Sequence, residues 1–233
     1  MENRKHTSLK DLAQALGVSI PTVSRALKDS PEISRELCAK VKALAKEMNY
    51  RPNPFAMSLR KNAPRIIGVI VPDIVTHFFA SILNGIENMA IANGYFVIIT
   101  TSHESYEHEK RNIENLVNMR VEGIIACLSQ ETTDFSHISA LKDINMPLIL
   151  FDRVCLTDQF SSVIADGAQS AQMATQHLLD NGSKRVAFIG GANHLDIVKR
   201  RKHGYLEALR ENRIPIEKEL VVCRKIDYEE GKI

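Results

Sequence analysis

The sequence predicts a two-part fold, in which an all-α head of three helices precedes a larger α/β core built on parallel sheets. Residues 8–27 carry two short helical patterns around a glycine. From Arg65 onward, short β-branched runs alternate with helical patterns. Charge also divides there, because residues 1–65 hold 13 Lys and Arg against 6 Asp and Glu, whereas the remainder holds 17 against 22. A basic head on an acidic body is typical of a protein in which one domain binds phosphates.

The first helix of the head begins after Ser8 and ends before Gly17. Its apolar residues have helical spacing and form one stripe: Leu9, Leu12, Ala13 and Leu16. Ser8 followed three residues later by Asp11 resembles a capping box. Gly17 stands where a left-handed backbone conformation ends a helix and permits a sharp turn.

The second helix starts at once, which makes the unit a helix-turn-helix. Ser19 is a good N-cap, and Pro21 falls in the first turn, where a missing N–H costs little. Val23, Ala26 and Leu27 are expected to face inward, and Thr22, Ser24 and Arg25 outward. Short polar side chains with one arginine suit the reading of a DNA major groove. The competing interpretation is an ordinary helical hairpin with a solvated arginine.

A third helix and a proline-rich segment complete the first part of the chain. Apolar residues at helical spacing over residues 33–48, with Ser34 as cap, predict the third helix. Prolines in residues 51–64 then break the helix, and Phe55, Ala56 and Leu59 within that segment could form a short amphipathic helix. We therefore expect a DNA-binding domain over residues 1–50, a hinge over 51–64 and a core over 65–233.

The core is expected to be doubly wound. Continuous apolar strands separated by helices favour a parallel sheet that is covered on both faces, and such sheets bind ligands at the carboxyl ends of their strands. The candidate strands are residues 66–71, 95–100, 123–127, 147–151, 162–164, 185–189 and 220–223.

The order and spacing of these motifs resemble one known family. The run from Leu12 to Leu27, then Asn-Tyr-Arg-Pro-Asn at residues 49–53, followed by Ala56 and Leu59, resembles the lactose-repressor/galactose-repressor (LacI/GalR) family of bacterial transcriptional regulators. The resemblance implies that the second helix enters the major groove, while the hinge helices of a dimer wedge a leucine pair, here Leu59, into a minor-groove base step. The implied DNA-binding residues are Ser19, Ile20, Pro21, Thr22, Ser24, Arg25, Lys28, Asn53, Ala56 and Leu59.

For the core, the resemblance implies a periplasmic-binding-protein-like fold of two doubly wound, parallel-sheet subdomains that close on a small effector such as a sugar or sugar phosphate. Arg201, in the basic stretch before Gly204, is the strongest candidate for an effector contact. A solvated basic helix face is the alternative interpretation of that stretch. The implied effector-binding residues are Asp73, His77, Phe78, Asp152, Arg153 and Arg201.

The same resemblance makes the second subdomain look incomplete. The family's second subdomain needs further strands after Cys223, so we expect its C-terminal part to be missing and its sheet to have an open edge.

These observations predict a sequence-specific transcriptional regulator. We expect a homodimeric repressor of a catabolic operon that binds a double-stranded operator and is released or enhanced by a sugar-like effector. The alternative is an inactive or non-regulatory, truncated ligand-binding module. We expect no enzyme, cofactor or metal site, because the sequence shows neither a catalytic constellation nor a phosphate loop.

The cysteines and the apolar segments indicate the compartment. Cys38, Cys127, Cys155 and Cys223 are scattered without paired spacing, which favours reduced structural thiols. No apolar run reaches the length of a membrane span and no signal peptide is recognisable, so we expect a cytoplasmic protein without membrane partners.

Overall fold

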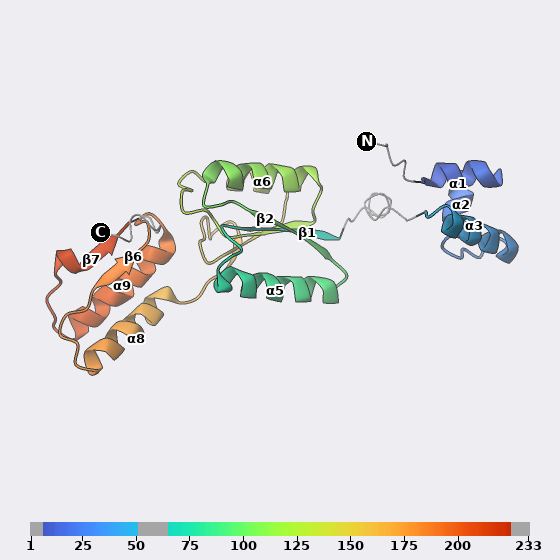
Figure 1. Cartoon of the computed structure of the whole chain (residues 1–233). Coiled ribbons are helices and arrows are strands. Elements are labelled where there is room, and N and C mark those ends of the chain that lie inside the picture. The colour runs from blue at the N-terminus through green and yellow to red at the C-terminus, as the bar shows by residue number, and fades with distance from the viewer. Residues whose placement is uncertain (1–6, 51–64, 225–233) are drawn as a thin grey trace, which may run out of the picture. The chain divides into compact units, whose positions relative to one another are not determined.

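The computed structural model describes residues 7–50 and 65–224, and the chain divides into two compact units between residues 63 and 64. We call residues 7–50 the head and residues 65–224 the α/β unit (Figure 1). None of the helices in these two ranges combines the length and the apolar character that a membrane span requires.

The head consists of α1 (Leu9–Leu16), α2 (Ile20–Ala26) and α3 (Arg35–Glu47). The expected capping box is formed, because Ser8 Oγ accepts a hydrogen bond from the Asp11 amide at 3.3 Å and Asp11 Oδ2 accepts one from the Ser8 amide at 2.8 Å. Gly17 adopts the left-handed conformation with φ of 63°, which ends α1 and turns the chain toward α2. Ser19 and Ser34 cap α2 and α3 as the sequence predicts.

One apolar core holds the three helices together. Its buried members come from all three helices and are at most 7% exposed: Leu12, Ala13, Val23, Ala26, Cys38, Val41 and Ala45. Since α2 has only seven residues, packing on α1 and α3 must supply most of its stability.

The α/β unit is built on a five-stranded parallel sheet in the order β2-β1-β3-β4-β5. β1 (Ile66–Val71) lies between β2 and β3, with Val69 paired to Ile99 on one side and to Ile125 on the other. The sheet's remaining strands are β2 (Phe96–Thr101), β3 (Gly123–Ala126), β4 (Leu148–Phe151) and β5 (Ser161–Val163).

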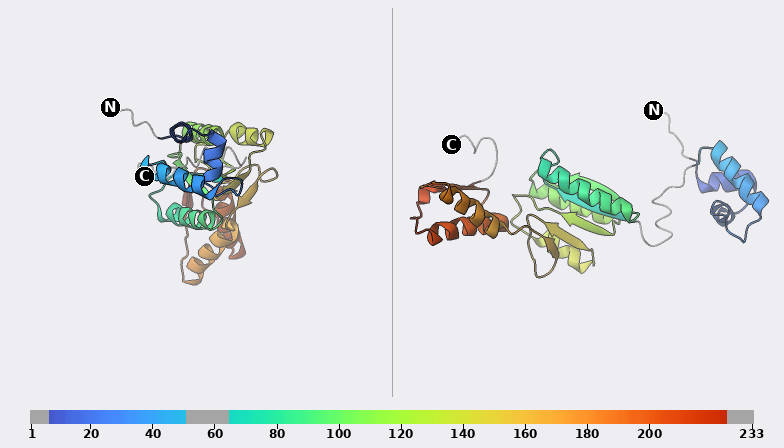
Figure 2. Two further views of the ribbon diagram at one scale, coloured as in Figure 1. Left: turned by 90° about the vertical axis from the view of Figure 1, so that its right-hand side faces the viewer. Right: turned by 90° about the horizontal axis from the view of Figure 1, so that it is seen from below.

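Helices cover both faces of this sheet, as expected for a doubly wound fold. Figures 1 and 2 show α5 (His77–Ala92) and α6 (Tyr106–Asn118) on opposite sides. Phe79 of α5 belongs to one buried cluster, with Val69 and Phe151. α6 and α7 (Ser136–Asp143) contribute to a larger cluster on the other face.

A smaller substructure follows, containing α8 (Gly167–Asp180), β6 (Phe188–Gly190), α9 (Asp196–Glu211), a 3₁₀ turn (Lys218–Leu220) and β7 (Val221–Cys223). β6 and β7 form a separate, two-stranded parallel sheet, much smaller than the first. Tyr205 of α9 is 2% exposed, and its hydroxyl donates to the Val186 carbonyl at 2.9 Å. Within the described part of the chain, Ile189 of β6 is left 84% exposed.

Six of the seven predicted strands lie within one residue of their observed bounds, and the strand expected at 185–189 is the exception. It begins only at Phe188, because its partner β7 is three residues long and offers few ladder positions. Arg185 instead pairs through its side chain with Glu217, at 2.6 Å between Nη2 and Oε2.

The four cysteines are free thiols. Burial raises the pKa of both Cys127 and Cys155 to about 12, so these groups stay protonated at neutral pH. This agrees with the structural role that the sequence predicts for them.

Candidate functional site

The outward face of α2 is the first candidate site. Ile20 is 41% exposed, Pro21 is exposed, and the Arg25 side chain is 59% exposed. Thr22 and Ser24 are half-buried at the edges of this face. Every predicted α2 residue therefore lies at or near the surface, on the side opposite the buried Val23 and Ala26.

The hydroxyl groups of Ser19 and Thr22, at the start of α2, hold each other in position. Ser19 Oγ accepts from the Thr22 amide at 3.3 Å and lies 2.8 Å from Thr22 Oγ1. A hydroxyl both donates and accepts, so each group keeps hydrogen-bonding capacity for a ligand while its position is set. The beginning of α2 is thus a preorganised polar edge beside the apolar Ile20 and Pro21.

The charged residues around α2 are of both signs. Lys28, just beyond the helix, is exposed. Arg25 Nη1 lies 3.0 Å from Glu32 Oε2, in the loop between α2 and α3. The sequence analysis missed Glu32, although a carboxylate soon after a predicted reading helix is a signal that could have drawn attention to it. The predicted hinge residues Asn53, Ala56 and Leu59 lie outside the described residues.

The second candidate site lies at the carboxyl ends of the sheet strands. After β1, Asp73 Oδ1 accepts from the Val75 amide at 2.6 Å, and His77 Nδ1 lies 3.4 Å from Ser81 Oγ. Phe78 is 50% exposed and packs edge-on against Phe79, with 5.1 Å between ring centroids. Asp73 is half-buried in the loop before α5, and His77 and Phe78 form the exposed beginning of that helix. None of the three lines the cavity described below.

Asp152, Arg153 and Arg201, by contrast, gather near one another. Burial raises the pKa of Asp152, and the positive charges of Arg153 and Arg201 oppose that increase. Arg201 is exposed, and its Cγ lies 3.3 Å from the place where a side chain at Gly167 would begin. Three of the six predicted effector residues are therefore close enough for their charges to interact.

Arg153 is the most firmly held of the three. Its Nη1 and Nη2 donate to the two carboxylate oxygens of Glu104 at 2.6 and 2.9 Å, and Nη1 also donates to the Leu128 carbonyl at 3.1 Å. Burial alone would lower the pKa of Arg153, but the hydrogen bonds to Glu104 and nearby negative groups raise it above its ordinary value. The guanidinium is therefore charged and fixed in orientation.

Arg153 also lines a cavity of about 260 Å³. The cavity brings together the loops after β3 and β4 with the beginning of α9, and its basic residues include Lys199 and Arg200 rather than Arg201. Arg200 is paired with Asp196 at 2.5 Å. The residues that line the cavity are Leu128, Thr132, Phe135, Arg153, Val154, Cys155, Leu156, Thr157, His194, Leu195, Asp196, Lys199 and Arg200.

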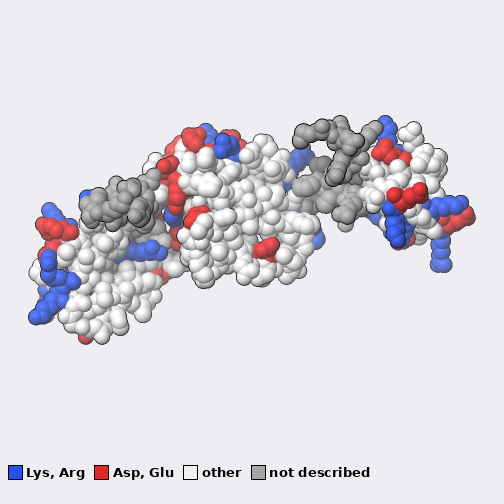
Figure 3. All heavy atoms as spheres, viewed as in Figure 1, with Lys and Arg blue, Asp and Glu red and all other residues white. Residues whose placement is uncertain are grey.

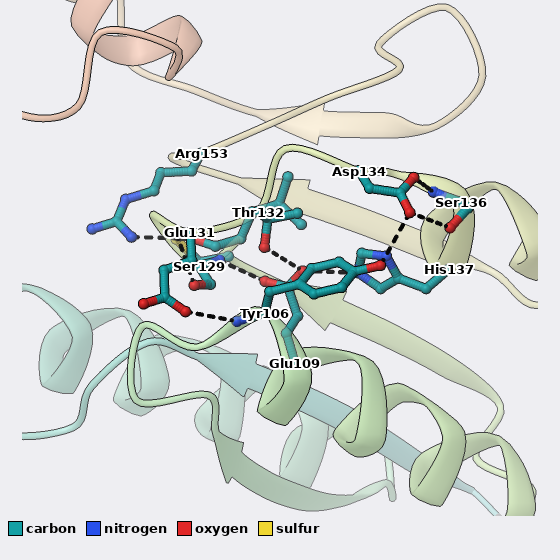
Figure 4. Close-up of polar contacts among 11 residues, drawn as sticks. Tyr106, Glu109, Ser129, Glu131, Thr132, Asp134, Ser136, His137 and Arg153 are labelled. Atoms are coloured by element: carbon teal, nitrogen blue, oxygen red, sulfur yellow. Dashed lines mark hydrogen bonds and ion pairs between the residues drawn. The ribbon is translucent and has the colours of Figure 1, made fainter. Parts of the chain in front are cut away.

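A buried polar network supports the loop after β3, and the sequence analysis missed it (Figure 4). Glu109 of α6 is 0% exposed. Its carboxylate accepts from the Ser129 amide at 2.5 Å and the Thr132 hydroxyl at 2.9 Å, and lies 2.8 Å from His137 Nε2. Glu109 thus ties three points of residues 129–137 to α6, and Thr132 carries that constraint to the cavity.

Comparison with protein families assigns both parts of the chain. Residues 8–53 match the family described as "Bacterial regulatory proteins, lacI family". Residues 65–232 match "Periplasmic binding proteins and sugar binding domain of LacI family". The chain belongs to the LacI family. The two matches divide this LacI-family chain as its two compact units do.

Curated relatives extend the similarity along nearly the whole chain. Catabolite control protein A of Priestia megaterium is 32% identical over 231 residues, covering 97% of this LacI-family chain and 68% of the relative. The ribose operon repressor of Bacillus subtilis (strain 168) is 32% identical over 204 residues, covering 88% and 60%. The chain thus spans between three fifths and about two thirds of the length of these relatives, which are named as regulators rather than enzymes.

Solved structures show the same architecture. The lac repressor dimer bound to operator and the anti-inducer ONPF has a TM-score of 0.73 and 26% identity, covering 94% of this chain and 66% of the other. A Cra transcriptional dual regulator from Pseudomonas putida, in complex with fructose 1-phosphate, has a TM-score of 0.59 and 25% identity, covering 69% and 57%. The LacI-type head and periplasmic-binding-protein-like core predicted from the sequence are confirmed.

Proposed function

We propose that this chain is a sequence-specific DNA-binding regulator, a repressor whose head reads an operator and whose α/β unit binds a small sugar-like effector. It acts in the cytoplasm, without catalytic activity. The observation that carries the DNA half of this proposal is the exposed face of α2, where Arg25 stands beside preorganised hydroxyls on a LacI-type head. Arginine binds guanine through two adjacent hydrogen bonds, and apolar groups such as those of Ile20 and Pro21 suit a thymine methyl.

The first prediction separates base reading from phosphate binding. Arg25→Ala is expected to weaken binding to the preferred duplex by about 1–3 kcal/mol and to relax preference at one base pair, because a bidentate base contact is lost. Lys28→Ala is the matched control, since a lost phosphate contact lowers affinity on every sequence and reduces the slope of log K against log salt by about 0.9. Fluorescence anisotropy measures both variants.

The full chain first selects its preferred duplex from a randomised library, and a scrambled duplex of equal length serves as the non-specific reference. If Arg25→Ala lowers affinity for the preferred and the scrambled duplex by the same factor, Arg25 does not read a base.

The hinge and the dimer complete the DNA half of the proposal. We place residues 51–64 as a hinge in which Asn53, Ala56 and Leu59 contact the minor groove. Homodimer formation is supported by the nearly uncharged outer face of α5, whose only charged residue is Glu87 and whose Met89 is 67% exposed. The surface around α5 is largely uncharged in Figure 3.

The effector half rests on Arg153 and the cavity that it lines. Among the described residues, the Arg153 Nε–H and one Nη2–H have no hydrogen-bond partner, so two donors remain for a hydroxyl or phosphate oxygen. Asp73, His77, Phe78, Asp152 and Arg201 remain proposed contributors.

A second prediction tests this half. Isothermal titration with a panel of sugars and sugar phosphates is expected to find a ligand, and Arg153→Ala should weaken its binding at least about tenfold, because a charged hydrogen bond is worth about 1.5–3 kcal/mol. Arg111→Ala, an exposed position on α6, controls for net charge. If no panel member binds, or if the two variants bind equally, the cavity is not the effector site.

A further inference from the structure

We propose that Glu32 is a positioning residue that sets DNA specificity, by holding the Arg25 guanidinium on the reading face of α2. This inference rests on the proposed DNA-binding function and adds a residue to it. The observation is the ion pair between Arg25 Nη1 and Glu32 Oε2 at 3.0 Å, in which both side chains are exposed, at 59% and 66%. A carboxylate beside a DNA-reading arginine would repel the phosphates of DNA, so its presence calls for a functional explanation.

The backbone around Glu32 is well fixed. The Ser30 amide donates to the Arg25 carbonyl at 3.1 Å, and the Ile33 amide donates to the Ser30 carbonyl at 3.0 Å. Ile33 packs against the apolar core of the head. The backbone of Glu32 is therefore held between an anchored turn and the packed side chain of Ile33, within reach of Arg25.

The geometry of the ion pair leaves Arg25 able to read a base. Glu32 engages Nη1 alone, and among the described residues the Nε and Nη2 groups of Arg25 have no partner. Those two adjacent groups form one edge of the guanidinium, and such a two-donor edge can make a bidentate contact with guanine O6 and N7. The pair thus orients the arginine without occupying the donors that the base needs.

Glu32 also acts against the wrong contacts. A free arginine on an exposed helix can reach many positions, including backbone phosphates, which supply essentially all non-specific affinity. Pairing with Glu32 makes those contacts less accessible to Arg25, because the guanidinium must leave the carboxylate before it can reach a phosphate. Specificity is a difference between two affinities, and a feature that penalises the wrong partner increases it.

Glu32→Gln of the full chain tests this inference, because glutamine keeps the shape of glutamate but lacks its charge. Binding to the scrambled duplex should strengthen several-fold, and the ratio of specific to non-specific affinity should fall about three- to tenfold, mainly at the base pair that Arg25 reads. Glu36→Gln is the matched control, because Glu36 is exposed and pairs with Lys40 at 2.8 Å on α3. It should leave the ratio unchanged.

A double variant separates positioning from general charge. In the Arg25→Ala background, Glu32→Gln should no longer change the ratio of affinities, because the residue that it positions is absent. An unchanged ratio in Glu32→Gln, or a fall that persists without Arg25, overturns the inference while leaving DNA binding intact. A wild-type chain that prefers no duplex overturns the proposed function itself. Far-UV circular dichroism verifies that each variant is folded.

Discussion

Replacing Glu109 with alanine is expected to lower the free energy of unfolding of the α/β unit by about 3–5 kcal/mol, the cost of removing one partner from a buried pair. Glu109 is fully buried and receives hydrogen bonds from Ser129 and Thr132 while contacting His137. Each of these groups would lose its partner inside the protein, where water cannot replace it. The effect should be largest at His137, because its Nδ1 atom is already buried without a partner among the described residues.

Urea denaturation followed by circular dichroism measures this effect, and hydrogen exchange locates it. Protection should fall first in residues 129–137, the segment that Glu109 holds (Figure 4). Glu114→Ala is the control, because Glu114 is exposed on the same helix and its loss should change stability by less than about 0.5 kcal/mol. Equal midpoints for the two variants would mean that the Glu109 network does not stabilise the unit.

A comparable loss, about 3 kcal/mol at the upper end of the range for overpacking, is expected for Gly204→Ala. A Cβ at Gly204 of α9 would lie 1.9 Å from the Ala168 carbonyl oxygen and 3.0 Å from the Gln172 amide nitrogen of α8. Both obstacles are backbone atoms, so the two helices must separate to make room. The close approach of α8 and α9 therefore depends on glycine at this position.

Gly85→Ala is the matched control, because the same substitution is expected to increase the free energy of unfolding there. Gly85 lies in α5, and a Cβ would meet no atom within 4 Å. Alanine should then stabilise the helix by up to about 1 kcal/mol through its higher helix propensity. Thermal unfolding of both variants decides the matter, and a stable Gly204→Ala protein would show that α8 and α9 are not packed as described.

Local signals in the sequence were sufficient to predict the helices and turns of the head. Ser8, Gly17 and Ser19 act through their immediate neighbours, so capping and turn chemistry can be predicted from a few residues. The strands of the first sheet were also found, because their apolar runs are continuous. The order β2-β1-β3-β4-β5 was not predicted, since it depends on how crossovers place strands that are distant in sequence.

The site was predictable only where its parts are adjacent in sequence. Arg153 follows a strand and was identified, but its partner Glu104 lies 49 residues earlier. Glu109 and His137 are 28 residues apart, and neither spacing nor composition connects them. One signal was available, because Glu109 lies in helical register with the buried Ile113 and Leu116. An acidic residue on an apolar stripe predicts a buried partner.

The prediction for Arg201 shows the limit of carrying a role from a family to one chain. Its neighbour Arg200 lines the cavity, whereas Arg201 lies against Gly167, near Asp152. Four consecutive basic residues on a helix point in different directions, and the sequence alone does not determine which one faces a ligand. The role of Arg201 stays a prediction that effector titration can test.

The most direct test of the central claim, that the outer face of α2 reads bases in the major groove, is methylation interference with the full chain. Duplexes selected from a randomised library are methylated at guanine N7, an acceptor that only the major groove presents. We expect a shared sequence in which methylation of particular guanines blocks binding, and Arg25→Ala should lose sensitivity at one of them. Binding that is equal on all duplexes, or unaffected by N7 methylation, would contradict the account.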